Sequence, residues 1–205
     1  MKIEELPPPL LSEVVSKVAA NNFQDLLQLQ QCSHKLAMVC LEPHMLRLLS
    51  FKSLYEIQTG GTSDTYYLQY VFMQKCVDDG NLEAMFVSGV ELFFLHQNRA
   101  DGLSILTKGA YLQHTGCKFA LAIALIYGND ADKVNGIQQL SNMNTNITNK
   151  LIIKHRREQM ISIVKRGWSN GLFHNIPACC EEDYGPSNYE GDMVHVKWWM
   201  VERIN

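Results

Sequence analysis

The sequence predicts an all-α protein, with an N-terminal helical module, a short α-solenoid of helical hairpins and an irregular C-terminal tail. Three observations predict this fold class. Apolar residues recur at helical spacing along most of the 205 residues, and no alternating strand pattern extends beyond a few residues. A short motif of glycine followed by alanine also recurs at a spacing typical of helical-hairpin repeats. A chain of this length can bury a sizeable core without disulfides or a structural metal.

The N-terminal part contains three apolar segments. Prolines 7–9 stand where the first helix is expected to start, and proline is tolerated in the first turn of a helix. Apolar residues then follow at helical spacing up to residue 20. Residues 24–41 restart the helical pattern, which Pro43 breaks, and residues 44–55 form the third apolar segment. We therefore expect a compact helical module at this end of the chain.

Changes in composition divide the chain into four segments. Residues 57–65, IQTGGTSDT, are rich in glycine, serine and threonine, as linkers are. We expect the helical module over residues 1–56, the linker over 57–65, the repeat domain over 66–175 and the irregular tail over 176–205.

Two short motifs that each recur later in the sequence indicate a repeat. The pentapeptide GNLEA at residues 80–84 recurs as GCKFA at 116–120, which is 36 residues later. The pentapeptide GLSIL at 102–106 recurs as GIQQL at 136–140, which is 34 residues later. Periods of this length are typical of helix-turn-helix solenoids. The glycines are expected to supply sharp turns, and the two alanines to occupy equivalent, tightly packed positions.

Residues 3–20 resemble the opening of an F-box. The family's Leu-Pro, apolar pair and Glu-Val are matched by LPPPLLSEVV from Leu6 onward, with Pro9 where an acidic residue is usual. A leucine-rich segment with Cys32 follows, and Glu42-Pro43 resembles the acid-proline pair that precedes the third F-box helix. The repeats resemble Sel-type, tetratricopeptide-like repeats. The order of the two parts resembles that of a plant F-box family.

This resemblance implies a substrate-recruiting adaptor of a Skp-cullin-RING ubiquitin ligase. The N-terminal helices would bind the Skp-type subunit, and the repeats would bind an unidentified target protein. The residues expected at the Skp contact are Leu6, Pro7, Leu10, Leu11 and Val14. A module of about 45 residues cannot bury all of its apolar residues internally, and an exposed apolar face marks a partner surface.

A purely structural interpretation of these apolar residues is that they form the core of a helical domain. It is favoured for some of them and not for others. Leu6, Pro7, Leu10 and Leu11 are expected to be partly exposed in the free chain. The remaining apolar positions of the module are expected in its core, namely Val15, Val18, Leu26, Leu29 and Leu36. A second interpretation of the whole chain is a helical-repeat scaffold outside any ligase, in which the N-terminal helices cap the solenoid.

Charge and hydropathy disfavour two classes of partner. The net charge is −3, so no global basic field points to a nucleic acid. The longest apolar run, residues 119–127, is far shorter than a membrane-spanning helix, and the N-terminus lacks the pattern of a signal peptide. We expect a soluble protein of the cytoplasm, the nucleus or both, with its six cysteines as free thiols.

Catalysis finds little support, because none of the common nucleotide, hydrolase or metalloprotease motifs is present. We expect no enzyme activity, cofactor or metal. His174, Cys179, Cys180 and His195 lie close together in the sequence, which leaves a zinc site or a Cys-His dyad as a minor alternative. Adjacent cysteines chelate one ion poorly, and this cluster is therefore interpreted as a tail with free thiols.

Two surfaces of the repeat domain are candidates for target capture. The first is the face lined by the first helix of each hairpin, expected over 82–95 and 118–127, where Glu83, Glu91 and Lys118 are predicted to face solvent. The second is the segment 150–166, in which six Lys and Arg residues oppose a single glutamate. The acidic residues 181–183 would partly neutralise this basic segment within the same molecule.

Overall fold

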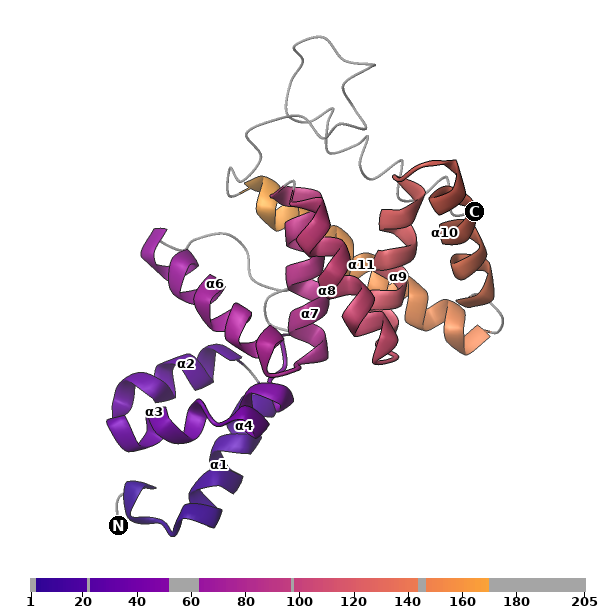
Figure 1. Ribbon diagram of the computed structural model, residues 1–205. Helices are drawn as coiled ribbons and strands as arrows, with labels where there is room; N and C mark the ends of the chain where they lie inside the picture. The colour runs from indigo at the N-terminus through magenta and orange to yellow at the C-terminus, as the bar shows by residue number, and fades with distance from the viewer. Residues whose placement is uncertain (1–2, 22, 52–62, 97, 144–146, 170–205) are drawn as a thin grey trace.

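The computed structural model describes residues 3–21, 23–51, 63–96, 98–143 and 147–169 (Figure 1). Every regular element in these ranges is helical, which confirms the all-α prediction. The predicted tail over 176–205 lies outside the described residues.

The described N-terminal residues form a small helical module. Its elements are the 3-10 turn η1 (Ile3–Glu5) and the helices α1 (Pro8–Asn21), α2 (Phe23–Cys32), α3 (His34–Cys40) and α4 (Pro43–Leu48). The apolar pattern over 24–41 is interrupted at Ser33, whose side chain accepts a hydrogen bond from the backbone N–H of Leu36 at 3.2 Å. The backbone of Ser33 is extended, so α2 ends there and α3 begins.

Helix α6 begins at Ser63, within the segment 57–65 that was predicted to be a linker. The rest of that linker lies outside the described residues. The elements that follow are α6 (Ser63–Asp78), α7 (Leu82–Val90) with its π-helical extension η2 (Glu91–Leu95), α8 (Arg99–Tyr111), α9 (Thr115–Ile126), α10 (Asp130–Met143) and α11 (Ile147–Ser169).

Two helical hairpins form the centre of this domain, α7–η2 with α8 and α9 with α10. A glycine of the second helix allows close approach in each hairpin. A methyl group added at Gly102 would lie 2.8 Å from Cβ of Phe93, and one added at Gly136 would lie 2.6 Å from the carbonyl oxygen of Ala122. Neither space admits a side chain, so the hairpins depend on glycine at these two places.

The first helices of the hairpins repeat after 33 residues, and the predicted offset of 36 is wrong. Asn81 and His114 are the N-caps of α7 and α9, and each side chain accepts from the backbone N–H three residues later. The residues before these caps, Gly80 and Gln113, both have positive φ, at 91° and 66°. Gly116, which the sequence pairs with Gly80, lies inside α9.

This change of register also separates the two alanines that were expected to be equivalent. Ala84 lies three residues after its N-cap and Ala120 lies six residues after its own. Both are fully buried, but they occupy successive turns of their helices. The offset of 34 between Gly102 and Gly136 agrees with the structure better, because Gly102 contacts Phe93 and Gly136 contacts Ile126, its equivalent 33 residues later.

The long helix α11 crosses the first helices of both hairpins. It packs against α7, η2 and α9, and in Figure 1 it passes behind them. With 23 residues it is about 34 Å long, enough to span two neighbouring hairpins. Met160, Ile163 and Val164 on its inner side are buried in the common core. The face of the repeats that the sequence assigns to target capture is therefore largely covered by the chain itself.

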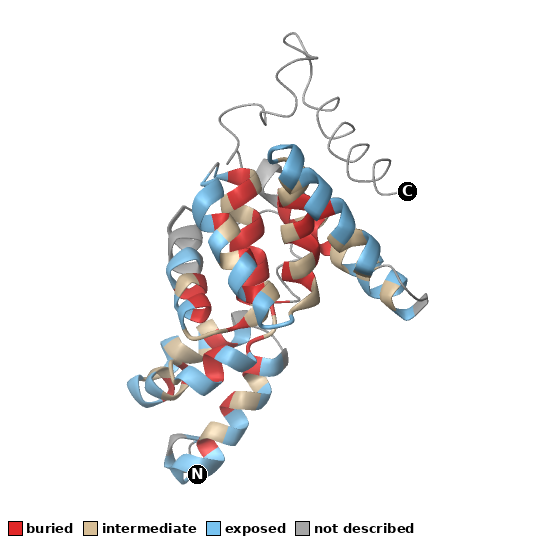
Figure 2. Ribbon diagram, turned by 45° about the vertical axis from the view of Figure 1, so that its right-hand side comes forward, coloured by how far each residue is buried: buried red, intermediate tan, exposed pale blue. Residues whose placement is uncertain are grey.

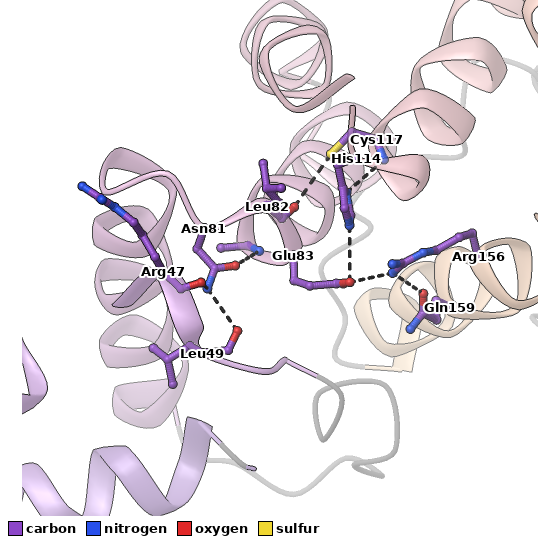
Figure 3. Close-up of polar contacts among 10 residues, drawn as sticks. Arg47, Leu49, Asn81, Leu82, Glu83, His114, Cys117, Arg156 and Gln159 are labelled. Atoms are coloured by element: carbon purple, nitrogen blue, oxygen red, sulfur yellow. Dashed lines mark hydrogen bonds and ion pairs between the residues drawn. The ribbon is translucent and has the colours of Figure 1, made fainter. Parts of the chain in front are cut away.

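The buried side chain of Asn81 helps to join the N-terminal module to the repeats. Asn81, which is 1% exposed, accepts at Oδ1 from the backbone N–H of Ala84 at 2.9 Å. Its Nδ2 donates to the carbonyl oxygens of Leu46 at 2.7 Å and Leu49 at 3.0 Å, at the end of α4 (Figure 3). Nε of Arg47 donates to the carbonyl oxygen of Asp79 at 2.8 Å beside it. The end of α4 and the start of α7 are thus held together.

None of the described helices combines the length and the apolar character needed to cross a membrane.

Replacing Asn81 by alanine should destabilise the protein by about 3 kcal/mol. The change removes an N-cap, worth about 1 kcal/mol, and leaves two buried carbonyl groups without a donor. Asn129 is the matched control, because its exposed side chain accepts only from the backbone N–H of Asp132 at the start of α10. Asn129→Ala should cost about 1 kcal/mol in urea unfolding. Equal losses for the two variants would contradict the joining role of Asn81.

Candidate docking surface

Helix α1 carries two apolar stripes, of which only one is used by the core. Leu11, Val15 and Ala19 are spaced by four residues and are fully buried. Leu10 and Val14 form a second stripe, about 100° around the helix, and their side chains are 50% and 36% exposed. Figure 2 shows buried and exposed positions alternating along the helix near the N-terminus. The second stripe is an apolar surface that the described fold leaves open to a partner.

The other predicted docking residues divide between this surface and the core. Pro7 is exposed at the start of α1, and Ile3 in the preceding turn is 43% exposed. Leu6 is half-buried and packs against the core. The expectation that Leu11 is partly exposed is wrong, because the register of α1 places it on the same stripe as Val15.

The residues assigned to the core of the module lie inside it or at its edge. Val15, Leu26 and Leu36 are buried. Val18 and Leu29 are half-buried. The core of the module and that of the repeats form one continuous cluster, which includes Leu46 of α4 and the buried Leu49 and Phe51 just after it.

On the repeat domain, the predicted capture face carries a cluster of paired polar groups. Oε1 of Glu83 accepts from Arg156 of α11 at 2.8 Å and from Nε2 of His114 at 3.3 Å (Figure 3). The same Arg156 nitrogen donates to Oε1 of Gln159 at 2.9 Å, and its guanidinium lies 5.9 Å from the ring centroid of Phe86. The prediction that Glu83 faces solvent is therefore wrong, because its charge is balanced within the fold. Glu91 and Lys118, which were also expected at the surface, are only half-exposed.

The hydrogen bonds decide the tautomer of His114. Its Nδ1 accepts from the backbone N–H of Cys117 at 3.3 Å, which is the N-cap bond of α9. Nε2 therefore carries the proton and donates it to Glu83. The imidazole links the start of α9 to α7, and Arg156 links α11 to α7.

The environment of Glu83 strongly favours its ionised form. Burial alone would raise the pKa of Glu83, but the hydrogen bond from His114 and the charge and hydrogen bond of Arg156 outweigh it and lower the pKa to about 2. The carboxylate is therefore a fixed negative charge at neutral pH. It serves as the common acceptor through which α11 is attached to the hairpins.

The pair His114–Cys117 has the spacing of a catalytic dyad but not its electrostatics. Nδ1 of His114 lies 3.2 Å from Sγ of Cys117. Burial, with the charge of Glu83 as a second cause, raises the pKa of the Cys117 thiol to about 12, and the residue is fully buried. A thiol in this state is neither a thiolate at neutral pH nor within reach of a substrate.

No group of three metal-ligating side chains is found among the described residues. The tail cluster of His174, Cys179, Cys180 and His195 lies outside them.

Sequence reasoning missed the polar cluster, although one signal was present. Arg156 shares a helix face with Met160 and Ile163, at spacings of four and seven residues. A basic residue on an otherwise buried face requires an acidic partner. The identity of that partner came only from the packing of α11 against α7.

A family model described as plant tetratrico peptide repeats matches residues 64–165. This part of the chain is therefore similar to plant tetratricopeptide-type repeats. The match begins within the first turn of α6 and ends near the end of α11, so it covers the hairpins together with the helix that crosses them.

Two curated proteins of Arabidopsis thaliana are similar to the chain. It is 25% identical over 133 residues to F-box protein At1g67340, covering 64% of this chain and 34% of the relative. It is 25% identical over 134 residues to F-box protein At5g50450, covering 64% of this chain and 39% of the relative. The chain thus spans between a third and two fifths of the length of these relatives. No solved structure matches. These findings confirm the resemblance to plant F-box proteins with helical repeats.

Replacing Glu83 by glutamine should destabilise the fold by roughly 2–3 kcal/mol at neutral pH, because the depressed pKa of Glu83 measures how much its charge is favoured in the folded state. This contribution is present above about pH 4.5 and is lost as the pH falls toward 2. The difference in unfolding free energy between wild type and Glu83→Gln should therefore shrink over that range.

Glu13→Gln is the control for this pH dependence. Glu13 pairs with Lys17 at 3.1 Å on the surface of α1, where its side chain is 60% exposed. A surface pair of this kind contributes less than about 1 kcal/mol. A Glu83→Gln variant as stable as Glu13→Gln at pH 7 would contradict the role of Glu83 as the common acceptor for Arg156 and His114.

Proposed function

We propose that this protein is an F-box-type adaptor, which docks on a Skp-type subunit of a cullin-RING ubiquitin ligase and presents a target protein on its repeats. The resemblance of residues 3–20 to an F-box and the two F-box relatives support this assignment. Such an adaptor performs no chemistry. It raises the effective concentration of the target near a ligase bound elsewhere in the complex, in the cytoplasm or nucleus.

The observation that carries the proposal is the second apolar stripe of α1. Leu10 and Val14 remain exposed although Leu11 and Val15, one residue further on, complete the packing of the helix against the module. Exposed apolar side chains gathered beside Pro7 and Ile3 gain free energy when a partner removes them from water. A groove on a Skp-type subunit that accepts an amphipathic helix would fit this surface.

The cover provided by α11 affects where a target would bind. Because α11 packs on α7, η2 and α9, the face lined by the first helices is not open to a ligand. We therefore place target binding on the outer surface of the repeat domain, where exposed apolar residues include Tyr111 on α8 and Val134 and Ile137 on α10.

A scaffold outside any ligase is the second candidate. The hydrogen bonds from Asn81 to the end of α4 favour it, because they attach the N-terminal helices to the first hairpin as a solenoid cap would be attached. A cap needs no exposed stripe on α1, so binding of a Skp-type subunit separates the two functions.

The double variant Leu10→Asp, Val14→Asp should abolish binding of a Skp-type subunit without unfolding the protein. Each anchor of such an interface contributes about 2 kcal/mol, so the loss of two anchors should lower affinity roughly a thousandfold. Affinity should be measured by titration with the purified Skp-type subunit, and folding by circular dichroism. Leu11 is left unchanged, because an aspartate at this buried position would unfold the module.

Val134→Asp, Ile137→Asp is the matched control. These residues form an exposed apolar pair on α10 in the repeat domain, at 66% and 56% exposure. The control should bind the Skp-type subunit as wild type does. A folded Leu10→Asp, Val14→Asp variant that keeps wild-type affinity would rule out docking through α1 and leave the scaffold.

A further inference from the structure

The outer side of α11 presents a basic stripe. Lys150 and Lys154 lie one turn apart and are exposed, and Arg157 follows at the next position of the same stripe. Within residues 150–166 the only acidic residue is Glu158. Since Arg156 is already paired with Glu83 on the inner side, the unbalanced charge of this helix is concentrated on its outer side.

Nothing within the described part of the chain covers this stripe. The inner side of α11 is packed on the hairpins, whereas Leu151, about 100° around the helix from Lys150, remains 63% exposed. Neither Lys150 nor Lys154 has an ion pair within the described residues. The outer side of α11 therefore combines positive charge with apolar surface and lacks a described partner.

The sequence contains a segment of opposite character shortly after α11. Residues 181–192, EEDYGPSNYEGD, hold five acidic residues and no basic one, together with two tyrosines. Residues 167–196 contain no lysine or arginine at all. This segment lies outside the described residues, and it is the strongest concentration of negative charge in the chain.

The length of the intervening chain allows the two to meet. Residue 150 lies 19 residues before the end of α11 at Ser169, which is about 28 Å along the helix axis. The 11 residues from 170 to 180 reach about 36 Å when extended. The connecting chain is thus long enough for the acidic segment to reach back along α11 as far as Lys150.

We propose that residues 181–192 bind in the same molecule to the outer side of α11, with their carboxylates on Lys150 and Lys154. A single exposed ion pair contributes less than about 1 kcal/mol. Several ion pairs formed by one tethered segment contribute more. The short tether gives the acidic segment an effective concentration near α11 of the order of millimolar, and a separate acidic peptide would have to exceed that concentration to compete. The contact is electrostatic and weakens as salt screens it. This inference is independent of docking through α1.

Zero-length crosslinking of the full chain tests the contact. A water-soluble carbodiimide joins a carboxylate to an amine only where the two touch, and mass spectrometry locates the joined residues. Links from Glu181, Glu182 or Asp183 to Lys150 and Lys154 should exceed links to Lys108 by about fivefold at low salt, and 0.5 M NaCl should remove this excess. Lys108 is the matched control, because it is exposed on a different helix, α8.

Two further measurements use a variant without the three carboxylates and a mixture of isotopically labelled and unlabelled chains. In Glu181→Gln, Glu182→Gln, Asp183→Asn the links should disappear, and the acetylation rate of Lys150 and Lys154, but not that of Lys108, should rise about threefold. Mixing isotopically heavy and light chains distinguishes links within one molecule from links between two. Links shared equally with Lys108, links found only between chains, or acetylation rates unchanged in the variant would overturn the proposal.

Discussion

The arrangement of the two halves of this protein depends on the buried side chain of Asn81. A buried amide is tolerated only when its donors and its acceptor are satisfied, and here they are satisfied by two different parts of the chain. The oxygen caps α7, and the nitrogen bonds carbonyl groups that the end of α4 would otherwise leave unpaired. One residue thus closes two helix ends and sets how they meet.

This junction extends to the surface that we propose for docking. Helix α4 packs against α1, and the backbone N–H of Ser50 donates to the carbonyl oxygen of Ala19 at 3.2 Å near the end of α1. A continuous set of buried residues then runs from α1 through α4 into the hairpins. The exposed stripe of Leu10 and Val14 is therefore fixed in direction relative to the repeats. A rigid connection of this kind suits an adaptor, because a target held on one half keeps a constant position relative to a partner held on the other.

The repeat domain is closed by its own last helix. In a helical solenoid the first helix of each hairpin contributes to one common face, and an open face of this kind is where ligands bind. Here α11 lies on that face, attached by its apolar inner side and by the pairing of Arg156 with Glu83. The face lined by the first helices is consequently part of the structural core. Surfaces left for recognition are the outer sides of α8, α10 and α11, where exposed apolar and basic residues gather.

The sequence by itself determined the helical class, most of the helices and the core positions of the N-terminal module, because each depends on the spacing of apolar residues within one helix. It also predicted the hairpin repeats, and its first residues resemble an F-box. The register of the repeat was decided by tertiary structure. The turn before α9 has Gln113 at positive φ, whereas the sequence pattern had matched Gly80 to Gly116. The burial of Leu11 followed from how α1 packs, because adjacent leucines at 10 and 11 look alike in one dimension. The pairing of Glu83 with Arg156, 73 residues away, arose only when α11 folded back across the first hairpin, and no local pattern encodes such a contact.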